Sequence, residues 1–190
     1  MKISLAAIGS IVVITFVAAT VHAAGITVAP FSFAPRGLGE FVPGGGPPAL
    51  ARWEKVSGDW QLFLAKNVPT AEIAAAGAQI NGVSGLSTTG LTIGFTVESG
   101  WCGAGAPRFN VRLANAGLVF LGCAHADLSG TFHSFTDGGI YGGVLFPTGD
   151  VVQSISIVFD EGTDVGPGFV YLDDITVGSD VAGAPGRSDQ

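Results

Sequence analysis

Apolar residues alternate with small or polar residues through most of this chain, with a period of two. The plainest case is residues 91–98, where Leu91, Ile93 and Phe95 alternate with threonine and glycine. Such alternation is typical of β-strands with one buried face. Similar runs of apolar, β-branched and aromatic residues occur at 26–33, 53–65, 108–113, 118–123, 151–159 and 169–177. The pattern therefore predicts an all-β protein.

The predicted strands are short and are separated by turns. Glycine supplies many of these turns, with 30 residues in a chain of 190, and it shows no collagen-like period. About eight or nine short strands joined by glycine turns favour a jelly-roll-type β-sandwich. One short helix is expected at residues 69–77, where Thr70 can cap its beginning and Gly77 can end it.

Two pairs of neighbouring strands are expected to form hairpins. Residues 154–178 contain two strands joined by an acidic turn that is rich in glycine and proline, and this hairpin is expected to close a sheet. In residues 108–123, a two-residue turn at Asn115 and Ala116 places Val111 opposite Phe120 on one apolar face.

The chain begins with the features of a secretory signal peptide. Lys2 precedes an uncharged apolar run from residue 3 to residue 21, and the segment ends at Ala23. We expect cleavage after Ala23; the alternative is an uncleaved membrane anchor, because the run is about 20 residues long. The mature part is expected to be one domain, residues 24–178, followed by a disordered tail, residues 179–190, that has few large apolar side chains.

Only two cysteines are present, Cys102 and Cys123, and both lie in the part predicted to be exported. A pair of cysteines in an oxidising compartment is expected to form a disulfide. The protein is therefore predicted to be secreted, to the extracellular space or the periplasm, without membrane contact once the signal peptide is removed.

Acidic residues are concentrated in the C-terminal part of the chain. The whole sequence has 15 acidic and 8 basic residues, and Arg187 is the only basic residue after Ala126. An acidic surface repels phosphate backbones, so nucleic acid is not an expected partner. The same charge suits either bound calcium or simple solubility outside the cell.

Three aspartates are candidate calcium ligands. Asp160 and Asp164 lie in the acidic turn of the 154–178 segment, and Asp173 lies inside a predicted strand, on the face of its apolar neighbours. A carboxylate on an apolar face needs a partner. That partner is either a structural calcium ion or a set of hydrogen-bond donors without a metal.

Residues 169–177, FVYLDDITV, resemble the final strand of jelly-roll carbohydrate-binding modules and galactose-binding-like domains. This resemblance implies a jelly roll with a structural calcium ion near Asp173, and it implies sugar binding. Residues 101–109, WCGAGAPRF, and residues 120–123, FLGC, resemble segments of uncharacterised exported bacterial proteins.

Four residues around the 108–123 hairpin are candidates for ligand binding: Trp101, Arg108, Asn110 and Arg112. An aromatic ring can stack on a sugar ring while polar neighbours bind its hydroxyl groups. The alternative for Trp101 is packing over the disulfide.

Catalytic motifs of the common hydrolases and nucleotide-binding enzymes are absent from the sequence. A minor hypothesis is a hydrolase that uses His125, Asp127 and His133. The leading prediction is a secreted, non-catalytic binding module for carbohydrate or another cell-surface ligand. The alternative is a structural or adhesive extracellular protein without a small-molecule site.

Overall fold

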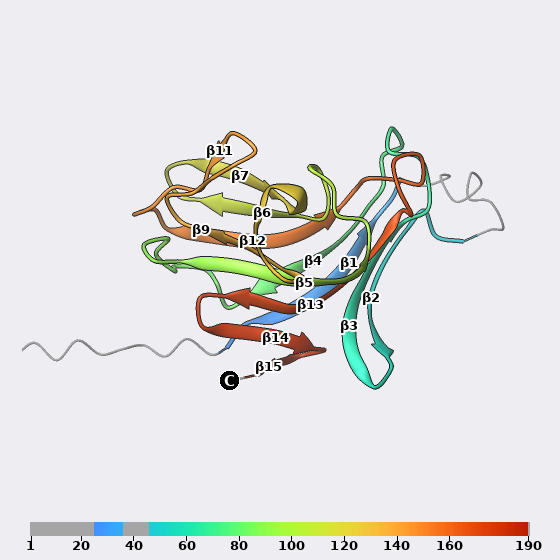
Figure 1. Cartoon of the computed structure of the whole chain (residues 1–190), viewed down its shortest axis with the longest axis horizontal. Coiled ribbons are helices and arrows are strands. Elements are labelled where there is room, and N and C mark those ends of the chain that lie inside the picture. The colour runs from blue at the N-terminus through green and yellow to red at the C-terminus, as the bar shows by residue number, and fades with distance from the viewer. Residues whose placement is uncertain (1–24, 36–45, 190) are drawn as a thin grey trace, which may run out of the picture.

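The structure, a computed structural model, describes residues 25–35 and 46–189. Within these residues it consists of antiparallel strands and one 3₁₀ turn, η2 (Cys123–His125) (Figure 1). The strands are β1 (Thr27–Phe33), β2 (Ala49–Val56), β3 (Asp59–Lys66), β4 (Ala75–Asn81), β5 (Thr92–Gly100), β6 (Arg108–Leu113), β7 (Gly117–Gly122), β8 (Asp127–Ser129), β9 (Phe132–Thr136), β10 (Ile140–Tyr141), β11 (Val144–Leu145), β12 (Val152–Phe159), β13 (Phe169–Val177), β14 (Asp180–Ala184) and β15 (Arg187–Asp189). The all-β class predicted from the sequence is confirmed.

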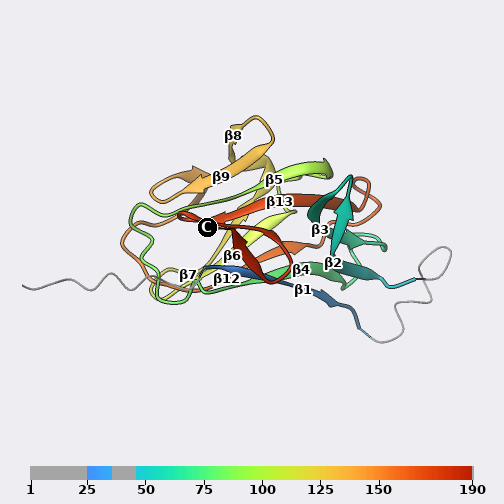
Figure 2. The ribbon, with the colours of Figure 1, turned by 90° about the horizontal axis from the view of Figure 1, so that it is seen from below.

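The strands form two principal sheets. Sheet A has the order β1-β4-β12-β6-β7, and the main path of sheet B has the order β15-β14-β13-β5-β9-β8. The β2–β3 hairpin extends sheet B, because β3 pairs with the first half of β13. The two sheets lie in separate layers (Figure 2), which confirms the predicted β-sandwich. The chain crosses between the layers from β4 to β5 and again from β5 to β6, as consecutive strands do in a jelly roll.

The hydrophobic core lies between the two sheets. Phe95 and Phe135 from sheet B and Phe109 from sheet A are fully buried. The ring centroid of Phe109 lies 5.1 Å from that of Phe95 and 5.9 Å from that of Phe135. Because successive side chains of a strand point to opposite faces, burial of Phe109 turns Arg108 and Asn110 to the outside of sheet A.

The two strands of residues 154–178 do not form the expected hairpin. β12 lies in sheet A between β4 and β6, whereas β13 lies in sheet B between β5 and β3. The segment between them is long enough to cross from one layer to the other, and Asp164 fixes it by accepting hydrogen bonds from the N–H and hydroxyl of Thr70 at 2.6 and 2.7 Å. The prediction is wrong because each strand finds its partners in a different sheet.

The helix expected at residues 69–77 is absent. Residues 70–73 form turns, and β4 begins at Ala75. Ala76 and Ala78 are fully buried in the core, and so short a helix has little stability of its own. Burial in the sheet therefore outweighs the helical preference of the alanines.

The β6–β7 hairpin differs from its predicted register by one residue. Val111 pairs with Val119, not with Phe120, and three residues, 114–116, form the turn. Gly117 follows with a φ of 78°, a conformation that glycine adopts at no steric cost. The shift turns Val119 towards the core and leaves Phe120 on the outer face beside Asn110.

Two further segments differ from the sequence prediction. The run at 53–65 belongs to two strands, β2 and β3, which turn at Ser57 and Gly58, both with positive φ. The tail predicted to be disordered contains β14, which pairs with the end of β13. Ala182 of β14 is fully buried, so this strand adds to the core as well as to the sheet.

The predicted signal peptide, residues 1–23, lies outside the described residues. Among the residues that the structure describes, no helix has the length and apolar character needed to cross a membrane.

Candidate functional site

Three of the predicted ligand-binding residues lie together on the outer face of sheet A. β6 presents Arg108, Asn110 and Arg112 on this face, at every second position. Asn110 pairs with Ser156 of β12 on one side and with Phe120 of β7 on the other. We call the outward side chains of these strands the sheet A face; its principal members are Gln79, Arg108, Asn110, Arg112, Phe120, Ser154 and Ser156.

The centre of the sheet A face carries polar groups, and apolar rings lie towards its edges. Gln79, Ser156 and Asn110 are paired in one row across three strands. At one edge Phe120 is 45% exposed. At the other edge Phe31 is 38% exposed, and its ring lies over Gly77, where an added Cβ would be only 2.5 Å from the Phe31 Cζ atom. A polar row that ends at one exposed ring, with a second exposed ring in the neighbouring row, suits a ligand with both hydroxyl groups and apolar surface.

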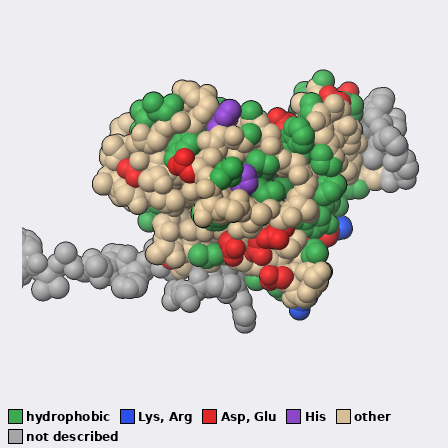
Figure 3. Space-filling model, viewed as in Figure 1, with side chains coloured by type: hydrophobic (Ala, Val, Ile, Leu, Met, Phe, Trp, Pro, Cys, Tyr) green, Lys and Arg blue, Asp and Glu red, His purple; other side chains and the backbone are tan. Residues whose placement is uncertain are grey.

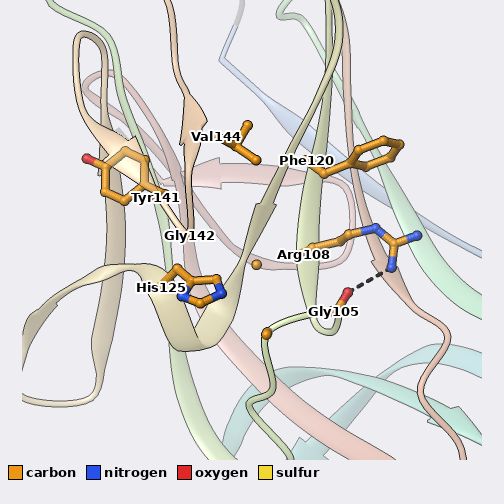
Figure 4. Close-up of a pocket in the computed structure, with 9 residues that line it drawn as sticks. Gly105, Arg108, Phe120, His125, Tyr141, Gly142 and Val144 are labelled. Atoms are coloured by element: carbon orange, nitrogen blue, oxygen red, sulfur yellow. Dashed lines mark hydrogen bonds between the residues drawn. The ribbon is translucent and has the colours of Figure 1, made fainter.

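Arg108 is held rigidly and its charge is balanced. Its Nη1 and Nη2 groups donate to the two carboxylate oxygens of Asp160 at 2.5 and 2.8 Å. Nη1 also donates to the Gly105 carbonyl at 2.7 Å (Figure 4). Nε donates to Asn110 Oδ1 at 3.0 Å. The guanidinium carbon lies 5.4 Å from the centre of the Phe120 ring. Arg108 therefore positions Asn110 and Phe120 more than it presents free donors.

Arg112 differs from Arg108 in being exposed. It pairs in register with Ser154 and Leu118, and it forms no hydrogen bond or ion pair with any residue that the structure describes. Its guanidinium group is available to a ligand.

A pocket of about 350 Å³ adjoins this face at the β7 edge. Its lining residues are Ala104, Gly105, Arg108, Phe120, Gly122, His125, Tyr141, Gly142 and Val144. Figure 4 shows Arg108 and Phe120 on one side of the pocket and His125 and Tyr141 on the other. The pocket joins apolar rings to the polar groups of Arg108 and His125.

Glycine and a buried phenol shape the wall of this pocket. The His125 ring lies against Gly142, where a Cβ would be 2.4 Å from its Cδ2 atom. The Tyr141 hydroxyl is turned away from the pocket, because it donates to Asp127 Oδ2 at 3.0 Å and accepts from the N–H of Thr136 at 2.7 Å. Burial, together with the nearby Asp127 carboxylate, raises the pKa of Tyr141. Tyr141 thus offers the pocket its ring and not its hydroxyl.

Trp101 does not join the sheet A face. Its Nε1 donates to the Glu161 carboxylate, whose other oxygen accepts the N–H of Gly105 at 3.2 Å. Gly105 in turn accepts from Arg108. Trp101 therefore supports the loop that holds Arg108, and it also packs against the core.

The predicted disulfide between Cys102 and Cys123 is confirmed. The Nδ1 atom of His133 lies 3.5 Å from Cys123 Sγ and 3.2 Å from the Cys123 carbonyl oxygen. Within the described residues, only Cys102, Cys123 and His133 bring three potential metal-ligand atoms within 4.8 Å of one another, and both thiols are used in the disulfide. Within the described residues, His125, Asp127 and His133 therefore do not form a cluster that could hold a metal ion.

The three predicted calcium ligands are also not brought together in the described part of the chain. Asp160 pairs with Arg108, and Asp164 binds Thr70. The ammonium group of the buried Lys66 lies among the same loops and donates to the carbonyl oxygens of Thr70, Glu72 and Asp160 at 2.9, 2.7 and 2.9 Å. Burial lowers the pKa of Lys66, and the carboxylates of Asp160, Asp164 and Glu72 oppose that change. A protein cation already balances the negative charge here.

Asp173 lies in β13, on the outside of sheet B. It is 9% exposed and accepts a hydrogen bond from the N–H of Asp174 at 2.7 Å. Burial, helped by the carboxylates of Asp174, Asp59 and Glu98 and opposed by the Asp174 N–H, raises its pKa from 3.8 to about 6. The predicted alternation is interrupted here, because Asp174 has a φ of 45° and the pairing of β13 with β5 shifts after Asp173.

Sequence reasoning missed Phe120, Gln79 and Ser156 as members of the sheet A face. Phe120 was assigned to the core by the one-residue error in register. The alternation at Ser154 and Ser156 in β12 was a usable signal, since small polar residues there mark the outward positions of a central strand.

No protein-family model, curated protein or solved structure matches this chain.

Proposed function

We propose that this protein is an exported, non-catalytic binding module that holds a carbohydrate on the sheet A face and in the adjoining pocket. The observation that carries the proposal is the row Gln79–Ser156–Asn110, which ends at the exposed Phe120 ring. Sugar rings have an apolar face that stacks on an aromatic ring, and their hydroxyl groups bind amides and hydroxyls.

The rigidity of the site supports the same proposal. Asn110 and Phe120 are both held by Arg108, which is itself fixed by Asp160 and Gly105. A side chain that is ordered before binding loses little conformational entropy when the ligand arrives. The disulfide next to this loop limits its movement further.

A glycan array tests the proposal. Wild-type protein is compared with Phe120→Ala and Asn110→Ala, and Leu128→Ala is the control because Leu128 is an exposed apolar residue of sheet B. We expect roughly tenfold weaker binding for each sheet A variant, a loss of about 1.4 kcal/mol, and unchanged binding for the control. If the folded wild-type protein binds no saccharide, the alternative of a structural or adhesive protein replaces this proposal.

A structural calcium ion near Asp173 is a second part of the proposal. The ammonium group of Lys66 already balances the negative charge near Asp160 and Asp164, so Asp173 is the remaining candidate ligand for calcium. Bound calcium raises the melting temperature, because it stabilises only the folded state. Equal melting temperatures in calcium and in EDTA would remove calcium from the account.

A further inference from the structure

The two sheets differ sharply in charge. None of the five strands of sheet A contains an aspartate or a glutamate, and their only charged residues are Arg108 and Arg112. This is unexpected in a chain with 15 acidic and 8 basic residues. The sheet that carries the proposed saccharide site is therefore the one whose strands are free of carboxylates.

The strands of sheet B carry the carboxylates instead. Asp59, Glu98 and Asp174 lie close enough to Asp173 to raise its pKa. In the space-filling view, acidic side chains gather on the face of the molecule over β13 (Figure 3). The acidic surface predicted from composition is thus confined largely to one side of the sandwich and to the loops.

Arg112 is the uncompensated cation of the sheet A face. Arg108 has a bidentate partner in Asp160, whereas Arg112 is exposed and has no ionic partner among the described residues. The pairing of β6 with its neighbours places Arg112 beside Ser154 and Leu118, and Asn110 lies two positions away on the same face. A ligand that extends along β6 from the Phe120 ring reaches this guanidinium group.

We infer that the saccharide bound by the sheet A face is acidic, with a carboxylate or sulfate group that pairs with Arg112. The inference rests on the proposed function and specifies its ligand class. Arginine binds such groups through two parallel hydrogen bonds, which gives it both strength and orientation. A uronate carboxylate and a sugar sulfate share this chemistry.

The net charge of −7 does not prevent this binding. At physiological ionic strength the Debye length is about 8 Å, and the two sheets of a sandwich are about 10 Å apart. The carboxylates on the far side of sheet B are therefore screened from a ligand on sheet A. Two carboxylates near this face already have protein partners: Asp160 pairs with Arg108, and Asp150 accepts from the N–H groups of Asn115 and Ala116.

The test is calorimetric titration with a matched pair of probes, an oligogalacturonate and its fully methyl-esterified form, in which each charged carboxylate is replaced by a neutral methyl ester. A sulfated oligosaccharide and its unsulfated parent form a second pair and distinguish the two anionic groups. The proteins are wild type, Arg112→Gln, Arg112→Lys and the control Lys55→Gln. Lys55→Gln makes the same change of charge at an exposed site in sheet B.

We expect at least one anionic probe to bind wild-type protein tenfold or more tightly than its neutral partner, and added salt to weaken that binding. Arg112→Gln should remove the preference for the anionic probe, Arg112→Lys should retain part of it, and Lys55→Gln should leave it unchanged. Equal binding of charged and neutral probes would overturn the inference but leave the proposed function standing. Binding of none of these probes, by protein shown to be folded, would overturn the inference; the proposed function falls only if no saccharide on the glycan array binds.

Discussion

At the scale of single residues, Lys66 is the most buried charged residue in the described part of the chain. It is 1% exposed, and its ammonium group donates to three carbonyl oxygens from two separate loops. Removal of the ammonium would take a donor from all three carbonyls, of which that of Glu72 also accepts from the N–H of Ala74. Lys66 thus joins the turns at 70–73 to the end of β12, beside the loop that holds Arg108.

We predict that Lys66→Met lowers the free energy of unfolding by about 3 kcal/mol, because it removes the three charge-assisted hydrogen bonds that join the two loops. Urea denaturation measures this change. Lys55→Met is the control, since Lys55 is exposed and should change stability by less than about 0.5 kcal/mol. Similar losses in the two variants would contradict the structural role assigned to Lys66.

The raised pKa of Asp173 leads us to predict that the stability of the protein depends on pH. Its pKa is raised from 3.8 to about 6, so the folded protein binds this proton more tightly than the unfolded chain does. The stabilising contribution is complete below about pH 4 and is lost as the pH rises through about 6. In EDTA, the wild-type melting temperature should therefore fall across this window.

The variant Asp173→Asn isolates this effect. The amide cannot ionise, so the variant should lose most of the pH slope and be more stable than wild type at pH 7 by about 1–3 kcal/mol. Thermal unfolding in EDTA at several pH values between 4 and 7 is the measurement. A slope unchanged by the substitution would show that other groups cause the pH dependence.

At the scale of elements, the disulfide joins the glycine-rich loop before β6 to the end of β7. Cys102 and Cys123 are 21 residues apart, and closing a loop of that length should stabilise the protein by roughly 3 kcal/mol. The double variant Cys102→Ser, Cys123→Ser should lose about this amount in urea denaturation. The effect should also reach the binding site, since the same loop provides Gly105 to Arg108. Unchanged stability and binding would contradict this role.

The alternation of side chains was sufficient to predict most strands and their outward faces. It placed Arg108, Asn110 and Arg112 on one side of β6, and that placement is confirmed. Alternation does not reveal which strands pair, because the partners of β12 and β13 depend on contacts distant in sequence. For this reason the prediction of a hairpin at residues 154–178 was wrong. The turn after β6 has three residues where two were predicted. This difference shifts the register by one residue, so the prediction placed Phe120 on the wrong face of β7.

Short segments were the hardest to predict, because context decides their structure. The alanines of 74–78 favour a helix in isolation, but burial between the sheets makes them part of β4. Trp101 is a residue type that commonly stacks on sugars. Its hydrogen bond to Glu161 and its packing against the core instead make it a support for the loop that holds Arg108. These outcomes depend on packing between residues far apart in the chain.

At the scale of the whole molecule, the sandwich separates two roles. Sheet B and the loops carry most carboxylates, which favour solubility, whereas sheet A presents polar groups, exposed rings and arginine. β14 extends sheet B beyond residue 178, so the domain is longer than the sequence predicted. The Arg108–Asp160 pair stands at the end of the sheet A face and joins it to the loops that Lys66 holds.

The central claim is that the sheet A face binds the ligand. Backbone amide chemical shifts, measured by NMR while an oligosaccharide identified on the array is added, test it most directly. The largest changes should fall on Gln79, Asn110, Phe120 and Ser156, and they should be absent from β13 and β14. Changes centred on sheet B, or an interaction that leaves β6, β7 and β12 unperturbed, would contradict the claim.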